Sequence, residues 1–369
     1  MHPALHWKKL PNQKIQCRLC AHYCLIKEGE FGFCRVRKNS GGALVSLSYG
    51  LARGVAIDPI EKKPFFQFFP GSRVLSFGTP GCNFTCLGCQ NWDLSQEPRL
   101  GVSEATEGPL QRKSRSLQPE ELVKLATGTD GLAYTYSEPT IFWEYALDCI
   151  RLSRKLGKRT AESSRGWTRS RAARGEGKQL YNVFVSNGFF SRELANQIIK
   201  EKLLDAVRID LKFMDEKNYK NYCGGRLKPV LDNIRKFAKS EIHLEVMVLI
   251  IPDLNDSPAT LRKFAKFIAS VDKSIPIHFL RFFPQYKAEN RPTPDETLVL
   301  AGKIAKKEGL EYVYLGNSTI PGGEDTLCPG CGKTLVRREG FGVVENFLRA
   351  PACPFCERKL RRFVLSTKK

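Results

Sequence analysis

The chain has 369 residues and 42% of them are hydrophobic, which is enough for a large folded core and argues against global disorder. Its formal net charge of +21 favours anionic partners such as nucleic acid, phosphorylated ligands or acidic proteins. No apolar run approaches the length of a membrane span, and the N-terminus lacks the apolar segment of a signal peptide. We therefore expect a cytoplasmic protein that does not enter the membrane.

In chain order, residues 1–71 form a cysteine-rich N-terminal module and lead-in. Residues 72–318 then alternate between two patterns. Apolar runs typical of strands buried on both faces occur at 73–77, 131–136, 182–186, 206–212, 243–251, 276–283 and, more briefly, 312–315. Helical patterns lie between them at 119–126, 140–156, 191–203, 228–240, 257–271 and 295–308.

This alternation predicts an α/β fold with a parallel sheet and right-handed crossovers, namely a partial (β/α)6 TIM-like barrel. In such barrels the functional residues lie at the C-terminal ends of the strands. Residues 319–369 carry two Cys-x-x-Cys pairs and are predicted to form a zinc-ribbon-like C-terminal module. Residues 158–178 are basic and show no apolar period, so they are interpreted as a flexible insertion or a basic docking loop.

Thirteen cysteines in a reducing compartment are typical of metal ligands rather than disulfides. Eleven of them fall into three clusters, and Cys149 and Cys223 stand alone as small buried hydrophobes. The central cluster, Cys82-x3-Cys86-x2-Cys89, directly follows the first core strand. Three soft thiolates with no fourth nearby ligand suit an iron–sulfur cluster that keeps one iron open. The alternative is a structural zinc site that takes its fourth ligand from elsewhere.

The central motif resembles that of the radical S-adenosylmethionine (SAM) superfamily. The similarity extends to AYTYSEP from Ala133, VSNG from Val185, IDLKF from Ile209, IPDLNDS from Ile251 and HFLRFFP from His278. Together these motifs resemble the radical SAM enzymes of the AmmeMemoRadiSam system, relatives of pyruvate formate-lyase activating enzyme. The resemblance spans nearly the whole chain, from Cys17 to Cys356.

The resemblance implies a 4Fe–4S cluster held by Cys82, Cys86 and Cys89, with SAM on the open iron. One electron would cleave SAM to methionine and a 5′-deoxyadenosyl radical, which would abstract hydrogen from a partner protein or a metabolite. Partner proteins of the same system, and an electron donor such as ferredoxin or flavodoxin, are expected. Many family members have an aromatic residue before the third cysteine, whereas this chain has Gly88, so we expect Leu87 or Phe84 to take its place beside the adenine.

Polar residues at the strand ends are the candidate SAM contacts. Glu138 suits the SAM ammonium, or else it is an acid at a helix N-terminus. Ser186 and Asn187 suit ribose hydroxyls or the methionine carboxylate, or else they form a turn. Asp210 and Lys212 face the same side of one strand, as SAM contacts or as a structural ion pair. His278 is the sixth candidate, with a satisfied core histidine as its alternative.

The two outer clusters have four cysteines each. Cys17, Cys20, Cys24 and Cys34 are interpreted as a closed metal site, with zinc favoured over an auxiliary iron–sulfur cluster. Cys328, Cys331, Cys353 and Cys356 are interpreted as a zinc ribbon, either a structural staple or a docking module.

Two other functions are compatible with the sequence. One is a radical SAM enzyme that modifies RNA, and the other is a non-enzymatic zinc-module protein that binds nucleic acid through its basic surface. The second does not account for an open three-cysteine site after a barrel strand.

Overall fold

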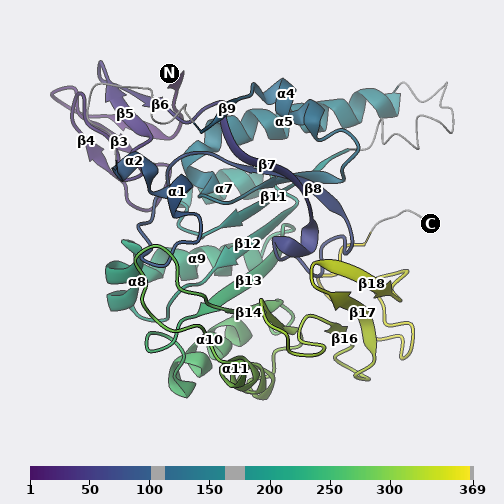
Figure 1. Cartoon of the computed structure of the whole chain (residues 1–369). Coiled ribbons are helices and arrows are strands. Elements are labelled where there is room, and N and C mark those ends of the chain that lie inside the picture. The colour runs from purple at the N-terminus through teal and green to yellow at the C-terminus, as the bar shows by residue number, and fades with distance from the viewer. Residues whose placement is uncertain (101–112, 163–178, 366–369) are drawn as a thin grey trace. The chain divides into compact units, whose positions relative to one another are not determined.

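A computed structural model describes residues 1–100, 113–162 and 179–365 (Figure 1). The chain divides into two compact units. Unit 1 comprises Met1–Asp58 and Arg73–Asp205, and unit 2 comprises Pro59–Ser72 and Ala206–Lys369. Both units combine helices with a set of parallel strands, as the alternating sequence pattern predicts, and both also contain short antiparallel strands. The domain boundaries predicted from the sequence, after 71 and after 318, stay a prediction.

Three parallel strands form the centre of unit 1. They are β8 (Arg73–Gly78), β10 (Gly131–Tyr134) and β11 (Tyr181–Ser186), and β10 pairs with both of the others. Their side chains are almost all buried, which explains the continuous apolar runs in the sequence. Helices α4 (Pro119–Leu125) and α5 (Trp143–Glu162) lie side by side in this unit (Figure 1).

Four further parallel strands form the sheet of unit 2. They run in the order β12 (Ala206–Asp210), β13 (His243–Ile250), β14 (Ile277–Arg281) and β15 (Val313–Gly316). The helices of this unit include α9 (Leu227–Ala238), α10 (Pro258–Val271) and α11 (Asp295–Lys307). Helices α10 and α11 pack together, and α11 also packs on β14 and β15.

The helices differ from the expected ones mainly at the segment 140–156 and in one helix that was not expected. The helix expected at 140–156 begins as a 3₁₀ turn, η2 (Pro139–Phe142), and its α-helical part continues to Glu162. That helix therefore enters the predicted insertion, whose residues 163–178 lie outside the described part of the chain. Helix α8 (Glu216–Cys223) was not expected, because its sequence EKNYKNYC has few apolar residues to set a period. Helix α7 (Arg192–Lys200) has the expected Ser191 at its N-cap, where the hydroxyl accepts from Leu194 N.

Short antiparallel strands build the N-terminal part of unit 1. One sheet has the order β1 (His2–Pro3), β6 (Ala43–Ser46) and β5 (Arg37–Ser40). The other has the order β2 (Trp7–Lys9), β3 (Ile15–Cys17) and β4 (Leu25–Ile26). The remaining elements of unit 1 are β7 (Leu51–Pro59), which pairs with β9 (Arg115–Ser116), and the short helices α1 (Trp92–Ser95) and α2 (Glu97–Leu100).

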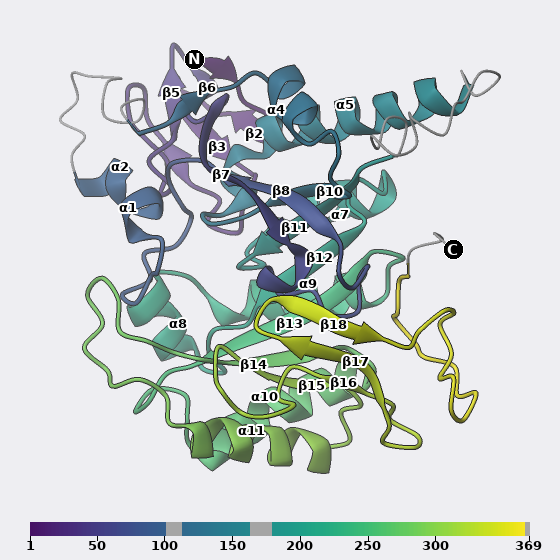
Figure 2. The same cartoon turned by 45° about the vertical axis from the view of Figure 1, so that its right-hand side comes forward.

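The C-terminal strands form a third small antiparallel sheet, β16 (Thr326–Leu327), β17 (Thr334–Glu339) and β18 (Gly342–Asn346), drawn in yellow in Figure 2. Its core includes Leu335, Val336, Leu348 and Phe363. The 3₁₀ turn η1 (Ile60–Lys62) opens the segment of unit 2 that also contributes Phe66 to this core. Of the helices described here, none combines the length and the apolar character needed to cross a bilayer.

Candidate functional site

The loop after β8 carries Cys82, Cys86 and Cys89. Gly81 opens it with a φ of +97°, and a Cβ at this position would lie 2.8 Å from Val36 Cγ1. Only glycine therefore fits this turn. The three cysteines are partly exposed, and the backbone N–H of Phe84 donates to Cys82 Sγ over 3.3 Å. An N–H donor stabilises a thiolate, so the loop is suited to hold a metal cluster.

Both ends of this loop are fixed to neighbouring elements. Gly81 N donates to Leu94 O in α1 over 3.1 Å, and Asn91 Nδ2 donates to Tyr136 O, just past the end of β10, over 2.8 Å. Cys89 Sγ lies 3.2 Å from the hydroxyl of Ser95, also in α1. The loop is thus anchored at the C-terminal ends of the strands, where the sequence predicts the site.

Glu138 accepts hydrogen bonds from polar residues that lie after β10 and at the end of β11. Its Oε1 accepts from the Thr140 hydroxyl at 2.5 Å and the Ser186 hydroxyl at 2.8 Å, and from Thr140 N at 3.1 Å. Its Oε2 accepts from Asn187 N at 2.8 Å. The structure therefore brings three of the predicted residues together, and it also shows Glu138 in its alternative role as the N-cap of η2.

The surroundings of Glu138 disfavour the charged form of its carboxyl group. All four donors to this buried carboxylate are uncharged groups, and burial raises its pKa despite their hydrogen bonds. Burial also raises the pKa of Cys82, and the charge of Glu138 raises it further. A cation bound beside Glu138 would relieve both effects, since buried charges require a partner.

Asn187 connects this carboxylate to the cysteine loop. Its Nδ2 donates to Asn83 Oδ1 over 2.7 Å, and Asn83 directly follows Cys82. Both residues are buried, and within the described residues Asn83 Nδ2 has no hydrogen-bond partner. The sequence motif did not mark Asn83, although its position beside a cysteine ligand was a signal.

Asp210 and Lys212 lie in unit 2, at the end of β12. Asp210 pairs with Lys212 at 3.3 Å, as the structural alternative expects, and with Arg208 at 2.5 Å. Sequence reasoning missed Arg208, although residues 208, 210 and 212 share one face of an extended strand. Burial lowers the pKa of Arg208 despite Asp210. The role of Asp210 and Lys212 toward SAM stays a prediction.

His278 is buried in unit 2, where its Nε2 donates to Glu245 Oε2 over 2.6 Å. Glu245 also accepts from His243 Nε2 at 2.9 Å and from the backbone N–H groups of Phe66 and Gln67 at 2.9 to 3.1 Å. This geometry matches the alternative of a core histidine at Nε2, although Nδ1 is buried without a hydrogen-bond partner among the described residues, and a contact of His278 to SAM stays a prediction. Glu245 was missed, because no short motif connects it to Phe66.

The N-terminal cysteines form a buried set in unit 1. Cys17, Cys20 and Cys34 are buried, Cys24 is half-buried, and Cys17 N donates to Cys24 O over 2.9 Å. Burial raises the pKa of Cys34 to about 11, and charges on Cys17 and Cys24 add to that rise. A metal ion would remove this penalty by binding the thiolates.

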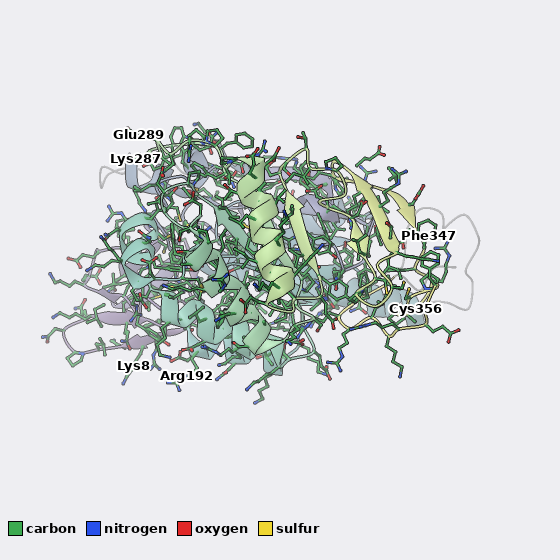
Figure 3. All side chains as sticks on the ribbon, turned by 90° about the horizontal axis from the view of Figure 1, so that it is seen from below. Lys8, Arg192, Lys287, Glu289, Phe347 and Cys356 are labelled. Carbon is green, nitrogen blue, oxygen red and sulfur yellow. The ribbon has the colours of Figure 1, made fainter. Side chains whose placement is uncertain are left out.

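The four C-terminal cysteines already have the spacing of a metal site. Cys328 Sγ lies 3.7 Å from Cys356 Sγ, and Cys331 Sγ lies 3.8 Å from Cys353 Sγ. All four sulfurs are within 4.8 Å of one another. Bonds of about 2.3 Å in a tetrahedron put sulfurs about 3.8 Å apart, which is the spacing of a tetrathiolate zinc or iron site. Figure 3 labels Cys356 and Phe347 in this module. Its metal is therefore supported, and its identity as zinc stays a prediction.

The residues expected to replace the missing aromatic before Cys89 differ in their exposure. Phe84 is buried and packs on Phe189, with ring centroids 5.1 Å apart. Leu87 is 38% exposed. Of the two, Leu87 is therefore the side chain free of the core and able to contact an adenine.

Comparison with known proteins gives the family. The model of the Radical SAM superfamily matches residues 77–267, more than half of the chain. An uncharacterised protein of Methanocaldococcus jannaschii, MJ0808, is 37% identical over 368 residues, covering 98% of this chain and 99% of that protein. The pyruvate formate-lyase-activating enzyme of Clostridium pasteurianum is 23% identical over 205 residues, covering 55% of this chain and 71% of that enzyme.

A solved domain of a pyruvate-formate lyase-activating enzyme from Bacteroides vulgatus covers 51% of this chain, and this chain covers 99% of it. The two share 16% sequence identity, and the TM-score is 0.39.

Proposed function

This chain belongs to the radical SAM superfamily, and on that premise we propose that it cleaves SAM reductively at a 4Fe–4S cluster held by Cys82, Cys86 and Cys89. The observation that carries the proposal is the position of these thiols. They lie on one anchored loop that Asn187 joins to the buried carboxylate of Glu138, because Asn187 donates both to Asn83 and to Glu138. The alternative of a structural zinc site does not use that carboxylate.

The residues of this loop fit the cluster and its ligand. Cys82, Cys86 and Cys89 would hold the cluster through three irons, which would leave one iron able to bind SAM. Glu138 provides a negative charge for the SAM ammonium, and Ser186 and Asn187 are held beside it by hydrogen bonds. When bound, the reduced cluster supplies the electron that splits the sulfonium of SAM into methionine and a 5′-deoxyadenosyl radical.

The hydrogen donor is proposed to be a partner protein or a metabolite. Support comes from the distant homology to pyruvate formate-lyase-activating enzyme, which is an enzyme of the activating type by name. Proteins of the AmmeMemoRadiSam system are the proposed partners, and a ferredoxin or flavodoxin is the proposed electron donor. We also propose that the protein is located in the cytoplasm.

An RNA substrate is the second candidate, supported by the formal charge of +21. Salt-sensitive binding of RNA by the holoenzyme, together with RNA-dependent consumption of SAM, would favour it over a protein substrate. A non-enzymatic nucleic-acid-binding protein is not proposed, because it does not account for the match to the Radical SAM superfamily.

The proposed function is tested by purifying the protein without oxygen, reducing it with dithionite and measuring 5′-deoxyadenosine after SAM is added. The wild type should contain iron and release 5′-deoxyadenosine, and Cys86→Ala should abolish the release. Cys223→Ala is the matched control, since Cys223 is a buried cysteine in α8, outside the three clusters. A colourless protein without iron, or undiminished cleavage by Cys86→Ala, would refute the proposal.

A further inference from the structure

The N-terminal cysteine set directly contacts the loop that carries Cys82. His22 lies between Cys20 and Cys24, and its Nε2 is 2.7 Å from the backbone oxygen of Asn83. Because a carbonyl oxygen can only accept, the imidazole must carry its proton on Nε2. The residue that follows Cys82 is therefore hydrogen-bonded by a side chain between two N-terminal cysteines.

Aromatic packing fixes the orientation of this imidazole. The His22 ring stacks on Phe33 at 4.1 Å, and its edge meets Phe189 at 4.9 Å. Phe189 in turn packs on Phe84 of the Cys82 loop. Phe33 precedes Cys34, and its N–H donates to Cys24 Sγ over 3.4 Å. The ring is thus held by residues that adjoin both cysteine sets.

Two further observations connect the same segments independently of His22. A Cβ on Gly81 would lie 3.0 Å from the carbonyl oxygen of Cys34. With standard backbone dimensions, this contact puts the Cα atoms of Cys34 and Cys82 no more than about 11 Å apart. Arg99 donates to Cys82 O over 2.8 Å and also to Phe33 O, so one guanidinium connects both segments.

The N-terminal set has a further feature of a metal site. Arg37 is buried, pairs with Glu144 over 2.9 Å, and has a buried Nε without a hydrogen-bond partner in the described part of the chain. Charges on Cys17 and Cys34 act on this guanidinium. A buried cation with an unused N–H offsets the negative charge that four thiolates bring to a metal.

We propose that Cys17, Cys20, Cys24 and Cys34 bind a metal centre that positions the Cys82 loop, and that His22 is the positioning residue between them. Strands β3 and β4 have only three and two residues, and a metal would add to the backbone bonds that already join Leu19 and Ala21 to the segment 189–191. The proposal rests on the proposed function, since it treats the Cys82 loop as the cluster loop. The proposal uses only the rigidity of the centre, since the N-terminal sulfurs are not all within 4.8 Å of one another as the C-terminal sulfurs are.

The test compares His22→Phe, His22→Gln and His2→Phe in the full-length, anaerobically reconstituted protein. Phenylalanine keeps the stacking on Phe33 but loses the donor, and glutamine restores a donor. His2 is the matched control, because it lies in the same N-terminal segment and stacks on Tyr49 at 3.6 Å. The readouts are the change that SAM causes in the electron paramagnetic resonance (EPR) spectrum of the reduced protein, and the affinity for SAM.

His22→Phe should broaden the EPR spectrum and weaken SAM binding, with a loss of up to about 100-fold in SAM cleavage, since misplacement of a reacting group by 1 Å has that cost. His22→Gln should recover most of the affinity, and His2→Phe should match the wild type. If His22→Phe matches His2→Phe in spectrum and affinity, the inference is overturned.

Cys24→Ser provides a second arm that measures the metal itself. Its metal content should fall relative to the wild type, and its SAM-dependent EPR change should be lost. Loss of the metal without loss of that change would overturn the inference. If Cys24→Ser fails to fold, the EPR spectrum and SAM affinity of His22→Phe still test the positioning role, because that variant keeps all the cysteines. A wild type that retains iron but does not cleave SAM contradicts the proposed function, whereas the EPR line shape of His22→Phe still tests the positioning.

Discussion

The side-chain amide of Asn187 donates to the side-chain oxygen of Asn83 over 2.7 Å. This bond joins the end of β11 to the residue that follows Cys82, and Asn187 N also donates to Glu138. The cysteine loop, the buried carboxylate and the end of β11 therefore form one hydrogen-bonded group. A change in any of them is expected to affect the binding of SAM.

Glu138→Gln should weaken SAM binding about 10- to 100-fold, because it removes one charge-assisted hydrogen bond of about 1.5–3 kcal/mol. Calorimetric titration of the reconstituted protein with SAM measures the change. Glu120→Gln is the control, since Glu120 is an exposed acid in the first turn of α4. Equal affinities in the two variants would show that Glu138 only caps η2.

Glu245→Gln should lower the free energy of unfolding by about 3 kcal/mol, as expected when one partner of a buried ionic network is removed. The amide would face donors from His243, His278 and the backbone of Phe66 and Gln67 with one acceptor oxygen fewer. Urea unfolding measures the shift. Glu241→Gln, at an exposed position two residues before β13, should change the urea midpoint little. A stable Glu245→Gln variant would contradict the importance of this network.

The same network predicts that stability falls as the pH falls. Burial raises the pKa of Glu245, but hydrogen bonds from His243 and His278 outweigh it and lower that pKa. Its contribution is therefore present above the unfolded value of about 4.3 and is lost below it. Burial also lowers the pKa of His278, so protonation favours the unfolded chain as the pH falls through about 6.5.

Both effects have the same sign, so the melting temperature should decrease between about pH 7 and about pH 3, first through His278 below about pH 6.5 and then through Glu245 below about pH 4.3. Scanning calorimetry in buffers of constant ionic strength measures it. The part of the decrease that occurs near pH 4 should be smaller in Glu245→Gln. A melting temperature that does not change over this range would show that neither group is linked to folding.

Cys331→Ser should remove the metal of the C-terminal module, at about one ion per chain. The sulfurs of the four cysteines are already within 4.8 Å, so a metal would join the two Cys-x-x-Cys turns, and its loss should loosen the module around its hydrophobic core. Metal analysis gives the loss, and faster tryptic cleavage after Arg337 and Arg338 reports opening of β17. Full metal content in the variant would mean that the metal is bound elsewhere.

Much of the fold follows from local sequence patterns. The buried strands β8, β10 to β15 were predicted to within one or two residues at most ends, because each is a continuous apolar run between turns. Helix α8 was missed because it is polar, and η2 because Pro139 fixes a 3₁₀ start that periodicity does not show. The three cysteine sets were found by spacing, since metal ligands that are near in sequence are near in space.

The contacts within the sites could not be predicted in the same way. The bond from His22 to Asn83 joins residues 61 apart, the bond from Asn187 to Asn83 spans 104, and that from Phe66 to Glu245 spans 179. No local pattern encodes such pairs, because they depend on which strand ends meet after the chain has folded. His278 shows the same limit, since only its burial beside Glu245 distinguishes a core residue from a cofactor contact.

The sequence by itself determined the type of chemistry, because the number and spacing of thiols decide how many irons they can hold and whether one stays open. It also determined the order of strands and helices, because the apolar period is local. Only the tertiary structure decided that Glu138, Ser186 and Asn187 share one hydrogen-bonded group, and that the N-terminal cysteines contact the Cys82 loop. Those relationships arise from packing between segments distant in the chain, where burial and hydrogen bonding select the partners.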